Sequence, residues 1–149
     1  MPDDPVDGGT FRIQSKATGK QLALVGSSEG AVFRKNHIVP RDQGVVWEVE
    51  HVLQGFRFTT RSVFPWAPQT GGEDIGRLAS NHERQVYAQK PNERYSQMWW
   101  LQDLGDGYWV LLNAATRLAL DGNYTDIYTS NPHYGDFQRW GLFAAPLEP

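Results

Sequence analysis

Three segments of this chain repeat the same four landmarks in the same order. Each segment opens with an aromatic strand after a glycine, continues with a Leu-Ala pair and then a β-branched residue followed by an aromatic one, and ends at a tryptophan. From the β-branched residue to the tryptophan the spacing is thirteen positions in the second and third segments and fifteen in the first, which indicates a loop insertion there. Such a repeat predicts units that bury their apolar faces only by packing on one another.

The count of three repeats favours one architecture. Three units of four short strands make about twelve strands, which suit a closed barrel capped by hairpins better than a flat sheet. We therefore expect an all-β protein with the β-trefoil fold, a single domain over residues 1–149 with repeats at approximately 9–53, 54–104 and 105–145. A β-sandwich is the alternative, because evenly spaced short strands also build that fold. The expected core consists of Leu22, Leu78, Leu118, Val32, Val86, Ile127, Trp47, Trp99 and Trp140.

Composition narrows the classes of partner. The chain has 149 residues, a net charge of -3 and no cysteine. A slightly acidic chain without a run of Lys or Arg lacks the basic surface that nucleic acid requires, and no segment reaches the roughly 18 apolar residues of a membrane-spanning helix. The absence of cysteine excludes disulfides and suits a reducing compartment. Because no signal peptide is visible, we expect a cytoplasmic protein that inserts into no membrane.

No arrangement of residues in the sequence indicates catalysis or a metal site. Without cysteine there is no Cys-His nucleophile pair, and a Gly-x-Ser-x-Gly motif is absent from the sequence. The four histidines, at positions 37, 51, 82 and 133, lack the spacing of metal ligands. We therefore expect no enzymatic activity and no cofactor.

Two Gln-x-Trp triplets, at 97–99 and 138–140, lie at equivalent places in the second and third units. They resemble the triplet that closes each repeat of ricin-B-type lectins. Phe-Arg-Ile-Gln at 11–14 and Gly-Lys-Gln-Leu-Ala-Leu at 19–24 are most similar to the small cysteine-free lectins of this type from mushrooms. The first unit departs from the pattern, since one residue too many separates Gln43 from Trp47. The resemblance implies a lectin for glycans of glycoproteins or glycolipids, most often containing galactose or N-acetylgalactosamine.

The resemblance also implies where a sugar would bind. In the family the sugar is held by an acid after the second strand of a unit and by polar groups beyond the third strand. Aligning the Leu-Ala pairs puts Asp121, Asn81 and Val25 at the place of the acid, and Asn92 and His133 beyond the third strand. Asp121 can accept hydrogen bonds from two neighbouring hydroxyls. The site residues implied are Asn81, His82, Asn92, Asp121, Asn123, His133 and Tyr134, with Asn36 and His37 as weaker candidates in the first unit.

The stacking aromatic of the family has no counterpart at its usual place, where this chain has Gln89 and Ser130. Tyr134, Tyr124 and Tyr128 are candidates to stack on the apolar face of a sugar instead. Each polar candidate also has a purely local interpretation, because Asn and Asp side chains cap turns through the neighbouring backbone.

A lectin is therefore the predicted function, with weak individual sites that gain useful affinity when several engage one glycosylated surface. A homodimer would add to that gain. The alternative is a β-trefoil protease inhibitor that acts through the Pro-rich loop at 63–76. A purely structural or signalling trefoil is a third interpretation.

Overall fold

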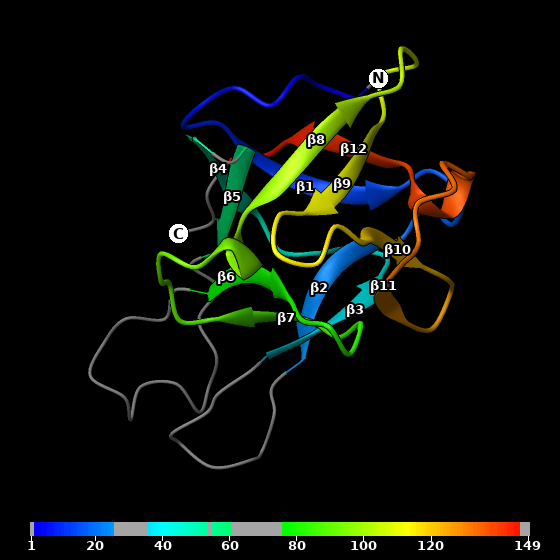
Figure 1. Cartoon of the computed structure of the whole chain (residues 1–149). Coiled ribbons are helices and arrows are strands. Elements are labelled where there is room, and N and C mark those ends of the chain that lie inside the picture. Colours follow the sequence, from blue (N-terminus) through cyan, green and yellow to red (C-terminus); the bar gives the residue numbers. More distant parts are fainter. Residues whose placement is uncertain (1, 26–35, 54, 61–75, 147–149) are drawn as a thin grey trace.

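A computed structural model describes residues 2–25, 36–53, 55–60 and 76–146 (Figure 1). These residues contain twelve β-strands and two short 3-10 helices. The first unit contributes β1 (Thr10–Ser15), β2 (Gln21–Val25), β3 (Asn36–Arg41) and β4 (Trp47–Val52). The second contributes β5 (Gly55–Thr60), β6 (Gly76–Ser80), β7 (Val86–Gln89), η2 (Tyr95–Gln97) and β8 (Trp99–Asp103). The third contributes β9 (Trp109–Asn113), β10 (Ala119–Gly122), β11 (Ile127–Ser130), η3 (Asp136–Gln138) and β12 (Trp140–Ala144).

Six of these strands close into a barrel. β1 pairs with β4 and β12, β5 pairs with β4 and β8, and β9 pairs with β8 and β12, all antiparallel. Each unit supplies its first and fourth strands to this ring. Closure removes the unpaired strand edges that an open sheet would expose.

The second and third strands of each unit form a hairpin: β2–β3, β6–β7 and β10–β11. Figure 1 shows the three hairpins gathered at one end of the barrel. They join there, because β3 pairs with β7 and Gln85 forms a bridge to Tyr128 of β11. Three similar four-stranded units around one axis are a β-trefoil, so the predicted fold is confirmed.

The core lies inside the barrel and under the hairpins. Strand residues alternate between the buried and the half-buried side, as in β1, because successive side chains point to opposite faces. A tryptophan begins the fourth strand of each unit and is fully buried. The buried cluster confirms the predicted core at Trp47, Trp99, Trp140, Leu22, Leu78 and Val86, with Ile127 packed against it.

The third unit departs from the predicted alignment. Leu118 is only half-buried, whereas Leu120 is fully buried. The indole N–H of Trp140 donates to the Leu120 carbonyl at 2.9 Å, as that of Trp99 donates to the Leu78 carbonyl at 3.0 Å. Leu120 is therefore the counterpart of Leu78, and the predicted core position of Leu118 is wrong by two residues. A shift of two leaves every side chain on the same face, so the apolar pattern alone did not reveal it.

The first unit departs from the prediction in its third strand. Ile38 is buried and lies opposite Leu24, as Val86 lies opposite Ser80 in the second unit. Ile38 thus takes the place predicted for Val32, which is outside the described residues. Only nine positions separate Ile38 from Trp47, and residues 42–46 contain no 3-10 helix. The first unit is therefore shorter than the others after its third strand, and the predicted insertion at that point is wrong.

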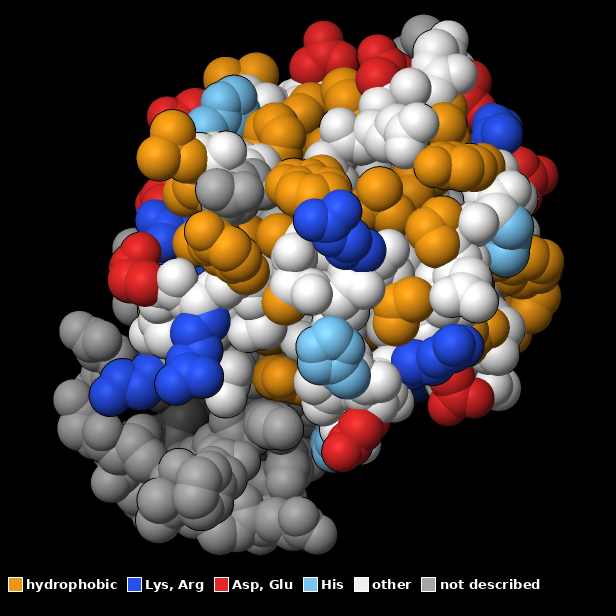
Figure 2. Space-filling model, viewed as in Figure 1, with side chains coloured by type: hydrophobic (Ala, Val, Ile, Leu, Met, Phe, Trp, Pro, Cys, Tyr) orange, Lys and Arg blue, Asp and Glu red, His pale blue; other side chains and the backbone are white. Residues whose placement is uncertain are grey.

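The surface gives two further observations. No helix in the described part of the chain is long and apolar enough to cross a lipid bilayer. On the face drawn in Figure 2, Lys and Arg side chains are scattered among acidic ones and form no single basic surface. The loop at 63–76, on which the inhibitor alternative rests, lies outside the described residues except for its last residue.

Candidate functional site

The third unit holds a buried carboxylate on β10. Asp121 has only 7% of its side chain exposed. Its Oδ1 accepts from the N–H of Gly122 at 2.7 Å, and its Oδ2 accepts from the Ser130 hydroxyl at 2.5 Å and from the Gln138 amide at 3.1 Å. These bonds compensate the cost of burying a charge. A carboxylate offers about four acceptor positions, so one position remains for a ligand and not the two expected from the sequence.

Strand register brings the partners of this carboxylate together. Asp121 pairs with Tyr128 across the β10–β11 hairpin. Ser130 lies two residues beyond Tyr128, and residues two apart on a strand share a face. Gln138, at the end of η3, reaches the same place, where its amide also donates to the Ser130 hydroxyl at 2.8 Å and the Asn131 carbonyl at 2.9 Å. The Gln of the Gln-x-Trp triplet therefore orients the acid.

His133 and Tyr134 lie beside this carboxylate, on the loop before η3. The Gln138 side-chain carbonyl accepts from the N–H groups of His133 at 2.8 Å and Tyr134 at 3.2 Å. Nε2 of His133 lies 3.8 Å from Oδ2 of Asp121, and the imidazole is 57% exposed. Tyr134 has a φ of 61°, which is uncommon for a bulky residue. Its carbonyl accepts from Nε of Arg139 at 2.9 Å, which helps to hold that backbone conformation.

Tyr128 and Asn123 border the site on the hairpin side. Burial, followed by the charge of Asp121, raises the pKa of Tyr128, while a side-chain hydrogen bond with Asn123 lowers it and Asp126 adds a smaller increase. The phenol is thus a neutral hydroxyl at pH 7. Oδ1 of Asn123 also accepts from the N–H groups of Thr125 and Asp126, each at 2.8 Å. Asn123 therefore caps the β10–β11 turn as well as contacting Tyr128.

The second unit contains the same buried glutamine with hydrogen bonds to the loop before it, which we call the glutamine frame, but it has no acid beside the glutamine. Gln97 is fully buried, and its side-chain carbonyl accepts from the N–H of Asn92 at 2.9 Å. Its amide donates to the Lys90 carbonyl at 2.9 Å and to the Gln89 side chain at 3.5 Å. The amide that binds a carboxylate in the third unit is here satisfied by neutral groups.

The corrected alignment explains this difference. Ala79 directly follows the buried leucine of β6, as Asp121 follows that of β10. Ala79 is therefore the counterpart of Asp121, and the predicted equivalence of Asn81 with Asp121 is wrong. Asn81 stands two residues further along and corresponds to Asn123.

The other residues predicted in the second unit have local roles. Oδ1 of Asn81 accepts from the N–H groups of Glu83 at 2.9 Å and Gln85 at 3.1 Å, which makes it a turn cap. His82 is exposed in the same turn. The side chain of Asn92 caps the turn before η2 in the same way, with a bond of 2.8 Å.

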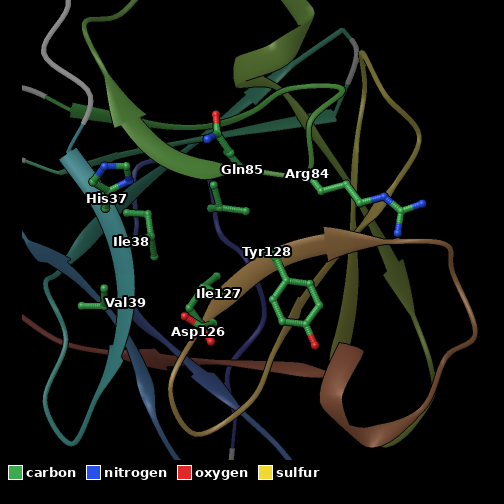
Figure 3. Close-up of a pocket in the computed structure, with 9 residues that line it drawn as sticks. His37, Ile38, Val39, Arg84, Gln85, Asp126, Ile127 and Tyr128 are labelled. Atoms are coloured by element: carbon green, nitrogen blue, oxygen red, sulfur yellow. The ribbon is translucent and has the colours of Figure 1, made fainter.

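The first unit has no counterpart of the loop that carries His133. Asn36 and His37, the weaker candidates in the first unit, begin β3 instead of following it. His37 lines a hollow of about 510 Å³ where the three hairpins meet, together with residues of β7 and β11 (Figure 3). Figure 3 shows Ile38 and Ile127 turned toward its interior. Asp121 does not line this hollow, whereas Tyr128, which pairs with Asp121 across the β10–β11 hairpin, does.

Sequence reasoning missed Ser130 and the orienting role of Gln138. Ser130 stands where the resemblance implied an aromatic ring, so the sequence indicated only a lost stacking group. The available signal was its position two residues after Tyr128, on the strand that pairs with β10.

The arrangement around Asp121 is suited to hydrogen bonding with neutral polar groups. It combines one ionised acceptor with the Tyr128 hydroxyl and the His133 imidazole, which can donate. Among the described residues no group of three or more His, Asp or Glu side chains could hold a metal ion.

Comparison with known proteins finds solved structures of similar fold. No protein-family model and no curated protein matches this chain. The designed threefold-symmetric protein ThreeFoil is 18% identical with a TM-score of 0.72, over 92% of this chain and 99% of that one. SeviL bound to the asialo-GM1 saccharide is 19% identical with a TM-score of 0.63, over 93% and 98% of the two chains. Lysenin in complex with phosphocholine is 19% identical with a TM-score of 0.67, over 97% of this chain and 47% of lysenin.

This chain thus spans about half the length of lysenin. At these identities the likeness shows the β-trefoil fold and leaves function to the site itself.

Proposed function

We propose that this protein binds carbohydrates through its third unit, as a ricin-B-like lectin of the small cysteine-free fungal type that catalyses no reaction. The observation that carries the proposal is the carboxylate of Asp121, oriented by Ser130 and Gln138 and faced by His133. Its remaining acceptor position takes one sugar hydroxyl in a charge-assisted hydrogen bond.

The surrounding residues complement this bond. The Tyr128 hydroxyl and the His133 imidazole are further groups that can donate to a ligand. Tyr134 is 39% exposed on the same loop as His133 and offers a ring for the apolar C–H face of a sugar. Sugars present both kinds of surface, so the site matches them in hydrogen bonding and in apolar contact.

Proteins of similar fold support this choice. SeviL has been solved with a saccharide and lysenin with phosphocholine. Of these two ligand classes, we favour a neutral sugar because the carboxylate, the imidazole and the phenol match the hydrogen bonding of hydroxyl groups. Galactose and N-acetylgalactosamine are the first sugars to test.

The proposed partners are glycans of glycoproteins or glycolipids, and neither nucleic acid nor the interior of a membrane. A site with few contacts binds weakly. Pairing of two chains in a homodimer would raise the avidity for a glycosylated surface. We propose that the protein acts in the cytoplasm or after release from it.

A glycan array tests the proposal directly. The protein is expected to bind a subset of neutral glycans, and the free terminal sugar should elute it from a column of the same sugar. Asp121→Asn should remove the binding while the protein keeps its fold by circular dichroism. Absence of binding to every neutral glycan would count against the proposal.

A further inference from the structure

The hollow where the three hairpins meet is lined equally by the three units. Each unit contributes three consecutive residues, from β3, from the start of β7 and from the start of β11: residues 37–39, 84–86 and 126–128. The volume is about 510 Å³, within the range of roughly 300 to 1,000 Å³ that small-molecule sites occupy. Neither Asp121 nor His133 lines the hollow, so it is a second candidate site, separate from the one proposed for sugars.

The floor of this hollow is apolar and has one residue from each unit at an equivalent position. Ile38, Val86 and Ile127 each pair with the second residue after the buried leucine of the preceding strand. Ile38 and Val86 are only 3% exposed, and Ile127 packs against the core cluster. Because core packing already holds these side chains, an apolar group of a ligand can be buried here without the cost of ordering the floor.

The rim of the hollow does not follow the threefold repeat. The residues that directly precede the three floor residues are His37, Gln85 and Asp126, an imidazole, an amide and a carboxylate. Figure 3 shows these three residues on different sides of the hollow. Arg84 also lines the hollow and adds a guanidinium. The rim therefore contains a positive charge from the second unit and a negative charge from the third.

These two charges do not neutralise each other in an ion pair. Arg84 and Asp126 are both exposed, and the Arg84 guanidinium has no hydrogen-bond or ion-pair partner among the described residues. Oδ2 of Asp126 accepts from the Thr125 hydroxyl at 3.0 Å, which leaves other acceptor positions of the carboxylate for a ligand. A ligand that carries both charges can therefore pair with both side chains.

Backbone contacts between units hold Arg84 and Gln85 beside the third unit. The Arg84 carbonyl accepts from the N–H of Thr129 at 3.1 Å, and Gln85 forms a bridge to Tyr128. Arg84 has a φ of 66°, which is uncommon for a residue other than glycine. The side-chain carbonyl of Gln85 accepts from the Asn81 amide at 2.9 Å. The Gln85 amide nitrogen therefore remains available to donate to a ligand.

We infer that this hollow binds a small zwitterion with an apolar side chain, which is the chemistry of a free apolar α-amino acid. Its ammonium group pairs with Asp126, and its carboxylate accepts from Arg84 and from the Gln85 amide. Its side chain packs on the aliphatic floor. The inference does not depend on sugar binding at the third unit.

Simpler ligands match only part of this lining. An aliphatic amine would contact the floor and Asp126 but leave Arg84 without a partner. An aliphatic carboxylic acid would pair with Arg84 but leave Asp126 without one. A neutral sugar would form hydrogen bonds with the rim, but it carries no branched aliphatic group for the floor.

The first test dissects the ligand. The parent probes are L-leucine, L-isoleucine and L-phenylalanine, titrated into the wild type by calorimetry. For leucine, 3-methylbutylamine lacks only the carboxylate, 4-methylpentanoic acid lacks only the ammonium group, and glycine lacks the side chain. At least one parent should bind, and the analogue of that parent that lacks any one of the three groups should bind about tenfold more weakly or worse. No binding by any parent, or equal binding by the amine or the acid, would overturn the inference.

The second test assigns each charge to its partner. Arg84→Gln and Asp126→Asn change exposed side chains, so both variants should keep the fold by circular dichroism. Each should bind the amino acid about tenfold more weakly. Arg84→Gln should also lose the preference for the amino acid over the amine, and Asp126→Asn the preference over the acid. The matched controls Arg94→Gln and Asp103→Asn remove the same charges elsewhere and should bind like the wild type. Wild-type affinity in both rim variants would contradict the inference.

The third test locates the ligand. In carbon-13 NMR the methyl groups of Ile38 and Ile127 should shift when the amino acid is added. Asp121→Asn should leave its affinity unchanged, and methyl galactoside, or the sugar that the glycan array selects, should not displace it. Displacement by the sugar, or unshifted methyl groups, would place the ligand elsewhere and overturn the inference. Neither result would affect the proposed sugar binding, which the glycan array tests separately.

Discussion

The second and third units share the glutamine frame and differ in the groups that the glutamine side-chain amide contacts. In both, the glutamine of a Gln-x-Trp triplet is fully buried and the following tryptophan donates to a leucine carbonyl. In both, the glutamine carbonyl accepts backbone N–H groups of the preceding loop. The amide of that glutamine meets neutral groups in the second unit and the carboxylate of Asp121 in the third.

This comparison separates the scaffold from the site. The frame stabilises any unit, because its hydrogen bonds satisfy buried backbone groups. In the proposed function, the capacity to bind depends on one position of the second strand of the unit, which is Ala79 on β6 and Asp121 on β10. A Gln-x-Trp triplet is therefore evidence for the fold, and the residue that its glutamine contacts is the evidence for a ligand.

The largest expected effect tests whether the frames are equivalent. Trp99→Ala and Trp140→Ala each remove a fully buried indole and leave a leucine carbonyl without its donor. Each should lower the free energy of unfolding by about 3 to 5 kcal/mol. Urea denaturation followed by fluorescence or circular dichroism measures both. A large cost at only one of the two positions would show that the units are not held by the same frame.

The next effect concerns binding at the third unit. Asp121→Asn keeps the shape of the side chain but removes the ionised acceptor, so the affinity for the sugar chosen by the glycan array should fall about a hundredfold. Isothermal titration calorimetry measures that affinity. Asn92→Ala changes the loop of the second unit that corresponds to the His133 loop, and it should leave affinity unchanged. Equal losses in the two variants would contradict the assignment of binding to the third unit.

A second site can be built to sharpen the comparison. Ala79→Asp combined with Gln89→Ser gives the second unit the acid and hydroxyl of the third, within reach of the Gln97 amide. The number of sugar molecules bound per chain should rise from one to two in calorimetry. The new site should bind roughly tenfold more weakly, because Asn92 stands where the third unit has His133. The Gln89→Ser single variant is the control and should still bind one.

The fold could be predicted from the sequence, because a threefold repeat with a buried tryptophan in each unit leaves few architectures that bury all of its apolar faces. The strand pairing within each unit could not be predicted as well. A shift of two residues keeps side chains on the same face, so Leu118 and Leu120 fit the pattern equally until the Trp140 hydrogen bond distinguishes them. That choice of leucine decides whether Asn81 or Ala79 is the counterpart of Asp121 in the second unit.

Other site residues depend on contacts that have no sequence pattern. Ser130 binds Asp121 only because β10 and β11 pair in one particular register. The place of His133 beside Asp121 depends on the loop before η3, where Gln138 accepts from the His133 backbone N–H. Residue type and spacing identified His133 as polar and well placed, and they carried no information on these hydrogen bonds.

The smallest expected effect concerns how the third unit holds its loop. Arg139, whose counterpart in the second unit is Met98, donates to Asp106 at 2.9 Å and to the Tyr134 carbonyl at 2.9 Å. Asp106 also accepts from Lys16 at 3.0 Å. Asp106→Asn should weaken these contacts of Arg139 and Lys16, which hold the loop of the third unit. It should lower sugar affinity by only about two- to threefold, since partly exposed ion pairs contribute less than about 1 kcal/mol. Calorimetry at low and at high salt measures the change, which salt should reduce.

The contacts of Asp106 also make the stability of the protein depend on pH. The hydrogen bond from Lys16, with those from the Tyr108 N–H and Arg139, holds the pKa of Asp106 at about 2 despite partial burial. A carboxyl whose pKa is lowered on folding contributes stability above its unfolded pKa near 3.9, and that contribution is lost as pH falls toward 2. The wild type should therefore lose stability more steeply than Asp106→Asn between about pH 4 and pH 2. Thermal unfolding of the two proteins across that range should give converging midpoints at the acid end. Parallel curves would mean that the loop of the third unit is held by the glutamine frame alone, as in the second.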